Sequence, residues 1–104
     1  METQNQQRNI LVIENDQKLN EGIVLALEND TYTFVQCRTI AEARKQMERS
    51  DISLVLLDIS LPGENGIGFV RELRKYSQVP VLLIAVSNME VDIETGLEAG
   101  ANDY

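Results

Sequence analysis

Four short apolar runs divide the chain, and polar or turn-forming residues separate them. They occupy residues 9–15, 32–37, 52–58 and 81–86. Each run has the length of a buried β-strand and is too short for a typical helix, and the second is rich in β-forming residues. Pro80 precedes the last run, a position at which a strand tolerates the missing N–H group. The pattern therefore predicts four β-strands.

Apolar side chains recur at helical spacing after each run, which predicts four helices. The first is expected over residues 16–29 and the third over residues 66–76. The second follows Thr39, which forms a capping-box pattern with Glu42, and the fourth is expected to stop at Gly100. The inner faces are formed by Leu19, Ile23, Ala26 and Leu27 in the first helix, Ile40, Ala43 and Met47 in the second, Phe69, Val70 and Leu73 in the third, and Ile93 and Leu97 in the fourth.

Strands that are apolar on both faces and alternate with helices indicate a parallel sheet covered on both sides. Right-handed crossovers restrict such a chain to a doubly wound α/β fold. The 104 residues have room for one small domain, expected over residues 9–104 after a flexible N-terminal tail at residues 1–8. In such sheets ligands bind at the carboxyl ends of the strands, so a site is expected there.

The charge balance excludes several classes of function. Nine Lys and Arg residues stand against 17 Asp and Glu residues, and the net charge of −8 disfavours direct binding of nucleic acid and favours cations. The absence of histidine excludes a Ser-His-Asp triad, a Cys-His pair and a His-ligated zinc site. No apolar stretch is long enough to span a bilayer, so no membrane partner is expected.

The single cysteine, Cys37, cannot form an internal disulfide, which suits a reducing compartment and predicts a cytoplasmic location. Because Cys37 lies in a predicted strand, we expect a buried structural thiol and not a nucleophile.

Acidic residues follow two of the predicted strands directly. Glu14, Asn15 and Asp16 end the first strand, and Asp58 ends the third. If these strands are neighbours, Glu14 and Asp58, with Asp16 as a further candidate, converge on one pocket and need a cation or a shared proton. Mg²⁺ is the natural cation for such oxygen ligands. Taken singly, Asp16 has a simpler explanation as a cap of the first helix and Asp58 as the start of a loop.

Four segments, "ILVIEND", "LVLLDISLPGENG", "VPVLLIAVS" and "GLEAGANDY", occur in an order and spacing that resembles the response-regulator receiver domain of two-component signalling. The resemblance covers residues 9–104 and is closest to receivers of transcriptional regulators with an attached DNA-binding domain. It implies a flavodoxin-like sheet of order 2-1-3-4-5. We expect order 2-1-3-4 here, because the family's fifth strand, its lysine and its last helix are missing from this chain, as in a fragment or a natural short form.

The resemblance also implies residue roles. Asp58 would accept a phosphoryl group from a sensor histidine kinase, which makes the chain a signalling domain and not a classical enzyme. Glu14 and Asn15 stand at the family's Mg²⁺-binding acidic pair, and the backbone carbonyl of Ser60 would be a further ligand. No other cofactor is implied. Gly63 and Gly66 in the turn after Asp58 are expected to permit unusual backbone angles.

Two departures from the family pattern weaken this reading. Asn15 replaces an acid, so weaker Mg²⁺ binding is expected, with Asp16 compensating in part. Ala85 replaces the Thr or Ser of the switch and has no hydroxyl, while Ser87 is a candidate substitute. Tyr104 stands at the position of the switch aromatic. The alternative function is a receiver-like interaction module, regulated by protein contacts independently of phosphorylation.

The missing fifth strand predicts an open edge on the fourth strand, and part of the first helix's face loses its cover as well. An open edge invites pairing with a second copy, so a homodimer through this edge is expected. A flavodoxin proper is a remote further alternative, because the acidic "ENDQK" segment at residues 14–18 would repel a cofactor phosphate.

Overall fold

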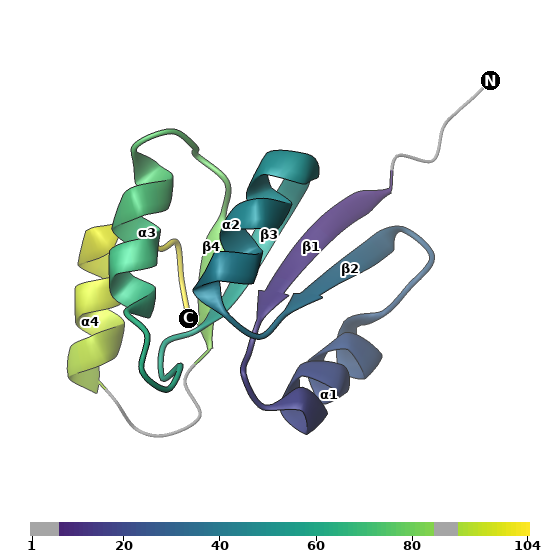
Figure 1. The fold of residues 1–104 in the computed structure, drawn as a ribbon, viewed down its shortest axis with the longest axis horizontal. Helices are drawn as coiled ribbons and strands as arrows, with labels where there is room; N and C mark the ends of the chain where they lie inside the picture. The colour runs from purple at the N-terminus through teal and green to yellow at the C-terminus, as the bar shows by residue number, and fades with distance from the viewer. Residues whose placement is uncertain (1–6, 85–89) are drawn as a thin grey trace.

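A computed structural model describes residues 7–84 and 90–104. Within them the chain forms a four-stranded parallel sheet in the order β2-β1-β3-β4, which confirms the predicted fold (Figure 1). The predicted strands match closely, although β1 begins one residue early and ends at Ile13, two residues before the predicted end. Residues 85–86 of the fourth predicted strand lie outside the described residues. The strands are β1 (Arg8–Ile13), β2 (Tyr32–Cys37), β3 (Ile52–Asp58) and β4 (Val81–Ile84).

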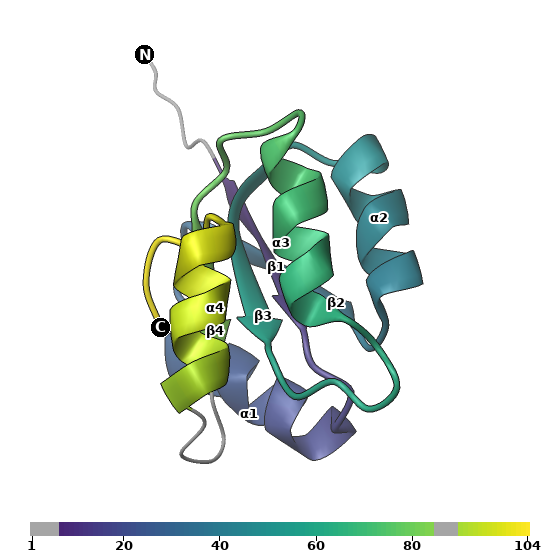
Figure 2. The same ribbon diagram turned by 90° about the vertical axis from the view of Figure 1, so that its left-hand side faces the viewer.

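Two apolar clusters cover the two faces of the sheet, because successive side chains of a strand point to opposite sides. The larger cluster joins alternate residues of the sheet, such as Leu11 and Leu57, to the helices α2, α3 and α4. The smaller one joins Ile10, Val12 and Leu56 to α1, which lies across the sheet from α2 and α3 (Figure 2). The helices are α1 (Gln17–Leu27), α2 (Ile40–Arg49), α3 (Gly66–Arg74) and α4 (Glu90–Ala99).

The predicted inner face of α1 is only partly correct. Ile23 and Val24 pack against the smaller cluster, but Ala26 is exposed and Leu27 is 44% exposed. The small cluster does not extend to the last turn of α1. Leu25 and Leu27, near the end of α1, are therefore exposed.

The starts of α1, α2 and α3 are capped by side chains, as the sequence predicts for the first two. Asp16 Oδ1 accepts a hydrogen bond from the Leu19 N–H at 3.1 Å, and Thr39 Oγ1 accepts one from the Glu42 N–H at 3.1 Å. The predicted capping box differs in one detail. The Glu42 carboxylate accepts from the N–H of Arg38 at 2.8 Å, one residue before the cap, and not from Thr39.

The end of the chain lies along the outer edge of β4. The Asn102 N–H donates to the Val81 carbonyl at 2.8 Å, and the Leu83 N–H donates to the Asp103 carbonyl at 2.9 Å. The predicted open edge is therefore partly occupied. Arg74 anchors this segment through its Nε–H, which donates to the carbonyl of Gly100 at 2.9 Å, and Gly100 has the positive φ expected of a helix stop, +125°.

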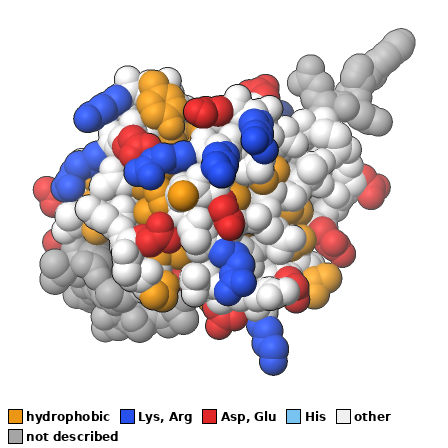
Figure 3. Space-filling view, in the orientation of Figure 1, with side chains coloured by type: hydrophobic (Ala, Val, Ile, Leu, Met, Phe, Trp, Pro, Cys, Tyr) orange, Lys and Arg blue, Asp and Glu red, His pale blue; other side chains and the backbone are white. Residues whose placement is uncertain are grey.

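Lys and Arg side chains are interspersed with Asp and Glu on the face shown in Figure 3, over α2 and α3, with apolar side chains between them. This distribution is typical of a solvated surface. Along residues 7–84 and 90–104, no helix combines the length and the apolar character that crossing a bilayer requires.

Candidate functional site

The two acidic strand ends meet at the carboxyl edge of the sheet. Asp58 is the last residue of β3 and Glu14 directly follows β1, and these strands pair in parallel with Ile13 opposite Leu57. Both acids are nearly inaccessible to solvent, Glu14 at 2% and Asp58 at 3% exposure. The predicted convergence of Glu14 and Asp58 is therefore confirmed.

Asp58 is held through one of its two carboxylate oxygens. Its Oδ1 accepts hydrogen bonds from the Ser60 N–H at 2.8 Å and from the Ser60 hydroxyl at 2.7 Å. Apart from the neighbouring Glu14 carboxyl group, which interacts with Asp58 through charge and a side-chain hydrogen bond, no donor among the described residues reaches Oδ2. One oxygen of Asp58 is thus fixed in place by two donors.

Glu14 is held less completely. Its Oε2 accepts from the Asp16 N–H at 3.0 Å, whereas its Oε1 is buried and has no hydrogen-bond partner in the described part of the chain. Burial raises the pKa of Glu14, and the negative charge of Asp58 raises it further, while the hydrogen bond from Asp16 acts in the opposite direction. A buried carboxylate oxygen without a donor, beside a second carboxylate, is the environment that a hard cation stabilises. The residues present therefore fit Mg²⁺.

The other predicted metal ligands lie around this pair. Asp16 is exposed and its Oδ1 caps α1, Asn15 is half-buried, and Ser60 is exposed. No three acidic or thiol side chains gather in a metal-binding cluster within residues 7–84 and 90–104, so the carboxylates brought together at the site are Glu14 and Asp58.

Of the three predicted switch residues, Tyr104 lies among the described residues. Ala85 and Ser87 lie outside the described residues. Tyr104 is 67% exposed and, with Ile93, Glu94 and Leu97, lines a surface hollow of about 340 Å³ beside α4. The structure thus places Tyr104 on the α4 surface.

The loop after Asp58 turns as its glycines suggest, with one correction. Gly63 has a positive φ of +69°, as predicted. Gly66 does not: it opens α3 without a positive φ, and an added Cβ there would make an ordinary van der Waals contact, 3.5 Å from the Asp58 carbonyl oxygen. The prediction of an unusual angle at Gly66 is wrong.

The sequence analysis missed two residues that organise the site. Asn20 is buried on α1, and its Nδ2 donates to the carbonyls of Glu14 and Cys37 at 3.1 Å each, which ties the ends of β1 and β2 together. A polar residue between the apolar positions Leu19 and Ile23 was the available indication. Arg38 follows β2, and its Nε–H donates to the Asn15 carbonyl at 3.1 Å. The chain therefore does place a cation beside these strand ends.

Cys37 is buried, as predicted, at 1% exposure. Burial, with a smaller contribution from the charge of Glu42, raises the pKa of its thiol to about 11. This pKa keeps the thiol protonated at neutral pH and unreactive, which is the behaviour of a structural cysteine.

Comparisons with known proteins agree with this geometry. The family model of the response regulator receiver domain matches residues 10–104. The KDP operon transcriptional regulatory protein KdpE of Escherichia coli is 33% identical over 96 residues, which are 92% of this chain and 43% of KdpE. The chain spans less than half the length of the curated relatives that it matches.

Solved receiver domains have the same fold. The receiver domain of the response regulator TorR, of the TMAO respiratory system, superimposes with a TM-score of 0.87 at 32% identity and covers 93% of this chain and 81% of its own. The BeF3-activated receiver domain of RstA from Klebsiella pneumoniae gives a TM-score of 0.85 at 31% identity, covering 93% and 83%. The chain belongs to the response regulator receiver domains of two-component signalling.

Proposed function

We propose that this receiver domain is a phosphoacceptor and that Asp58 takes a phosphoryl group from a sensor histidine kinase. The observation that carries the proposal is the state of the Asp58 carboxylate. It is buried at the end of β3, Ser60 fixes its Oδ1, and apart from the Glu14 carboxyl group no described donor engages its Oδ2. A carboxylate held in one orientation, with one oxygen that Ser60 does not engage, suits in-line attack on phosphorus.

In the proposed reaction, Asp58 Oδ2 forms the new O–P bond while the bond from phosphorus to the kinase's imidazole nitrogen breaks. The imidazole leaves with the electron pair of that bond. The two donors of Ser60 keep Oδ1 out of the reaction and hold the carboxyl plane. The product is an acyl phosphate on Asp58, whose hydrolysis would restore the carboxylate.

Mg²⁺ is the proposed cofactor, because the orphaned Oε1 of Glu14 beside Asp58 fits a hard cation. Glu14, Asp58, the Asn15 side chain and the Ser60 carbonyl would hold it, with Asp16 as an outer contributor. The ion would supply positive charge that offsets the phosphoryl oxygens. Asn15 brings an oxygen without a charge, so the affinity for Mg²⁺ is expected to be lower than with an acid at that position.

The wider context is proposed on the same basis. KdpE is named as a transcriptional regulator, and a DNA-binding output outside this chain would carry the response. A cytoplasmic location is part of the proposal, because a single free cysteine suits a reducing compartment. Self-association through the β4 edge remains a prediction, and light scattering at high protein concentration tests it: a monomer throughout would contradict it.

A second function is a receiver-like interaction module that works without phosphorylation. Asn15 is the observation that favours it, because it removes one charge from the metal site. Ala85 favours it too, since it has no hydroxyl to bind a phosphoryl group. In this case Asp58 would be a structural carboxylate bound by Ser60.

Intact-mass spectrometry separates the two functions. The protein is incubated with acetyl phosphate, with and without Mg²⁺, beside Asp58→Ala as the control. Gain of one phosphoryl mass that needs both Mg²⁺ and Asp58 supports the phosphoacceptor. If beryllofluoride leaves the spectrum of backbone amides unchanged and no mass is gained, the interaction module is supported instead.

A further inference from the structure

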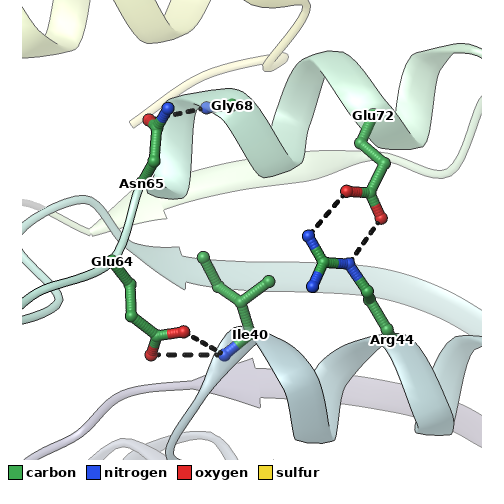
Figure 4. Close-up of polar contacts among 6 residues, drawn as sticks. All are labelled: Ile40, Arg44, Glu64, Asn65, Gly68 and Glu72. Carbon is green, nitrogen blue, oxygen red and sulfur yellow. Dashed lines mark hydrogen bonds and ion pairs between the residues drawn. The ribbon is translucent and has the colours of Figure 1, made fainter.

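The loop that carries the acceptor is tied to a second helix. Residues 59–65 connect β3 to α3, and Glu64 near the end of this loop reaches the start of α2. Its Oε1 and Oε2 accept from the Ile40 N–H at 3.1 and 3.3 Å (Figure 4). Glu64 is half-buried and Ile40 is 5% exposed, so the contact is partly shielded from water.

This contact completes the cap of α2. The first N–H groups of a helix have no partner within the helix. Thr39 Oγ1 accepts from the Glu42 N–H, and the Ile40 N–H takes its partner from Glu64, which is 24 residues away along the chain. A carboxylate at this position also interacts favourably with the helix dipole. The unpaired N–H group and the helix dipole therefore both favour a Glu64 carboxylate that lies at the N-terminus of α2.

Glu64 is one of several anchors of the loop that leads back to the acceptor. The Glu64 N–H donates to the Leu61 carbonyl at 3.3 Å. Leu61 and Ile59 are buried at 4% and 9% exposure, and Ser60 between them makes both hydrogen bonds to Asp58. The chain from Asp58 to Glu64 is thus anchored at both ends and in the middle.

The same end of α2 also contacts the loop of the other site acid. Arg38 directly precedes the cap, its N–H donates to Glu42 and its Nε–H donates to the Asn15 carbonyl. Asn15 follows Glu14. The start of α2 is therefore a common anchor: Arg38 attaches it to the loop of Glu14, and Glu64 attaches it to the loop of Asp58.

We propose that Glu64 is a positioning residue, which acts through Ser60 to hold the Asp58 carboxylate in register with Glu14. The inference extends to Glu64 the proposed phosphoacceptor role of Asp58, and rests on it for its effect on rate. Glu64 does not touch the reacting atoms. It acts by fixing the acceptor loop against the α2 N-terminus.

The chain offers a matched control on the same pair of helices. Glu72 on α3 makes a two-point ion pair with Arg44 on α2, with Nε–Oε2 and Nη2–Oε1 distances of 2.8 Å each (Figure 4). This pair also joins α3 to α2, but neither partner hydrogen-bonds to residues 59–65, although the charge of Arg44 interacts with that of Glu64. Glu72→Ala therefore loosens the helix pair while it leaves the hydrogen bonds from Glu64 to Ile40 and from Ser60 to Asp58 available.

The experiment compares Glu64→Ala, Glu64→Gln and Glu72→Ala with the wild type. The rate of phosphorylation by acetyl phosphate is measured by intact mass, and the amide resonances of Ile40 and Ser60 are followed by NMR without a phosphodonor. We expect Glu64→Ala to slow phosphorylation on the order of 10-fold, as a small displacement of a reacting group does. Its Ile40 amide should exchange faster with solvent, and its Ser60 resonance should shift. Glu64→Gln keeps an acceptor oxygen and should restore the wild-type values.

Glu72→Ala is expected to keep the wild-type rate and the wild-type Ser60 resonance, even where it lowers the unfolding midpoint. Equal slowing by Glu64→Ala and Glu72→Ala, or an unchanged Ser60 resonance in Glu64→Ala, would overturn the inference. If the wild type gains no phosphoryl mass, the proposed function fails, and a shifted Ser60 resonance in Glu64→Ala would still support positioning by Glu64. If Glu64→Ala does not fold, Glu64→Gln tests the inference alone. This variant keeps the oxygen that accepts from the Ile40 N–H, so a phosphorylation rate on the order of 10-fold below the wild type would overturn the inference.

Discussion

Glu14 and Asp58 are two carboxylates at the same edge of one sheet, and their surroundings differ. Both are almost fully buried. Asp58 Oδ1 receives two hydrogen bonds, from the N–H and the hydroxyl of Ser60. Glu14 receives one, from the Asp16 N–H, and its Oε1 has no partner among the described residues. The two carboxylates therefore differ in the number of hydrogen bonds that they receive and not in how deeply they are buried.

This difference assigns the two acids to different tasks. Hydrogen bonds to a carboxylate stabilise its charged form, and burial without donors destabilises it. Asp58 is thus kept in one orientation for attack, whereas Glu14, whose pKa burial and the Asp58 charge raise, is prepared for a cation or a proton. Substitutions at the two loops should therefore have separable effects.

The largest effect is expected at the acceptor. Asp58→Asn removes the attacking oxygen, so the gain of phosphoryl mass from acetyl phosphate should disappear entirely, at every Mg²⁺ concentration. Glu14→Gln keeps the acceptor and should only raise the Mg²⁺ concentration needed. Mass spectrometry over a Mg²⁺ series distinguishes the two, and phosphorylation of Asp58→Asn at another residue would break the assignment of roles.

The next effect concerns stability on the Glu14 side. Asn20→Ala removes the Nδ2 donor of the Glu14 and Cys37 carbonyls and also leaves Gln36 without its partner. We expect a loss of about 2–3 kcal/mol in the free energy of unfolding, measured by urea denaturation. Gln17→Ala, on the exposed side of the same helix, should change it by less than about 0.5 kcal/mol. Equal losses in the two variants would contradict a specific role for Asn20.

The class of fold could be predicted from periodicity, because apolar runs such as residues 52–58 specify strands and the β-α alternation indicates a doubly wound parallel sheet. The strand order 2-1-3-4 was expected from the family resemblance and not from periodicity. The exposure of Leu27 at the end of α1 was not predicted, for a physical reason. Leu27 satisfies the helical stripe, yet burial needs a facing surface, and the apolar cluster on that side of the sheet does not reach it.

The two acidic residues of the site could be predicted from the sequence, but the residues that hold them in place could not. Glu14 and Asp58 stand out because each ends an apolar run. Asn20 and Glu64 act through contacts with residues far away in sequence, at Cys37 and Ile40. Such contacts depend on how elements pack in three dimensions, which periodicity does not encode.

Restoring the missing charge should sharpen the comparison. Asn15→Asp adds a third carboxylate beside Glu14, and the affinity for Mg²⁺ should rise about 10-fold, because affinity in oxygen sites follows ligand charge. Calorimetric titration measures it. Asp16→Asn is the matched control: its amide oxygen can still cap α1 at Leu19, and a small change in affinity is expected. If Asp16→Asn lowers the affinity for Mg²⁺ by a larger factor than Asn15→Asp raises it, Asp16 and not residue 15 is the second ligand.

The smallest effect is the pH dependence of stability without Mg²⁺. The pKa of Glu14 is raised above its ordinary value of 4.5 in the folded state. A group of this kind contributes stability that is present below the unfolded pKa and is lost as the pH rises through the folded pKa. The wild type should therefore lose stability relative to Glu14→Gln as the pH rises from 4.5 through that raised value, as followed by urea midpoints.

Taking the difference between the two proteins removes the contribution of Glu72, whose pKa Arg44 lowers and which acts in the opposite direction. Added Mg²⁺ should cancel the loss in the wild type, because the ion stabilises the charged carboxylate, and should leave Glu14→Gln less affected. Parallel pH profiles for the two proteins would mean that Glu14 titrates alike in the folded and unfolded states. The contrast with Asp58 would then be one of hydrogen-bond geometry alone, and the case for a cation at Glu14 would lose its physical basis.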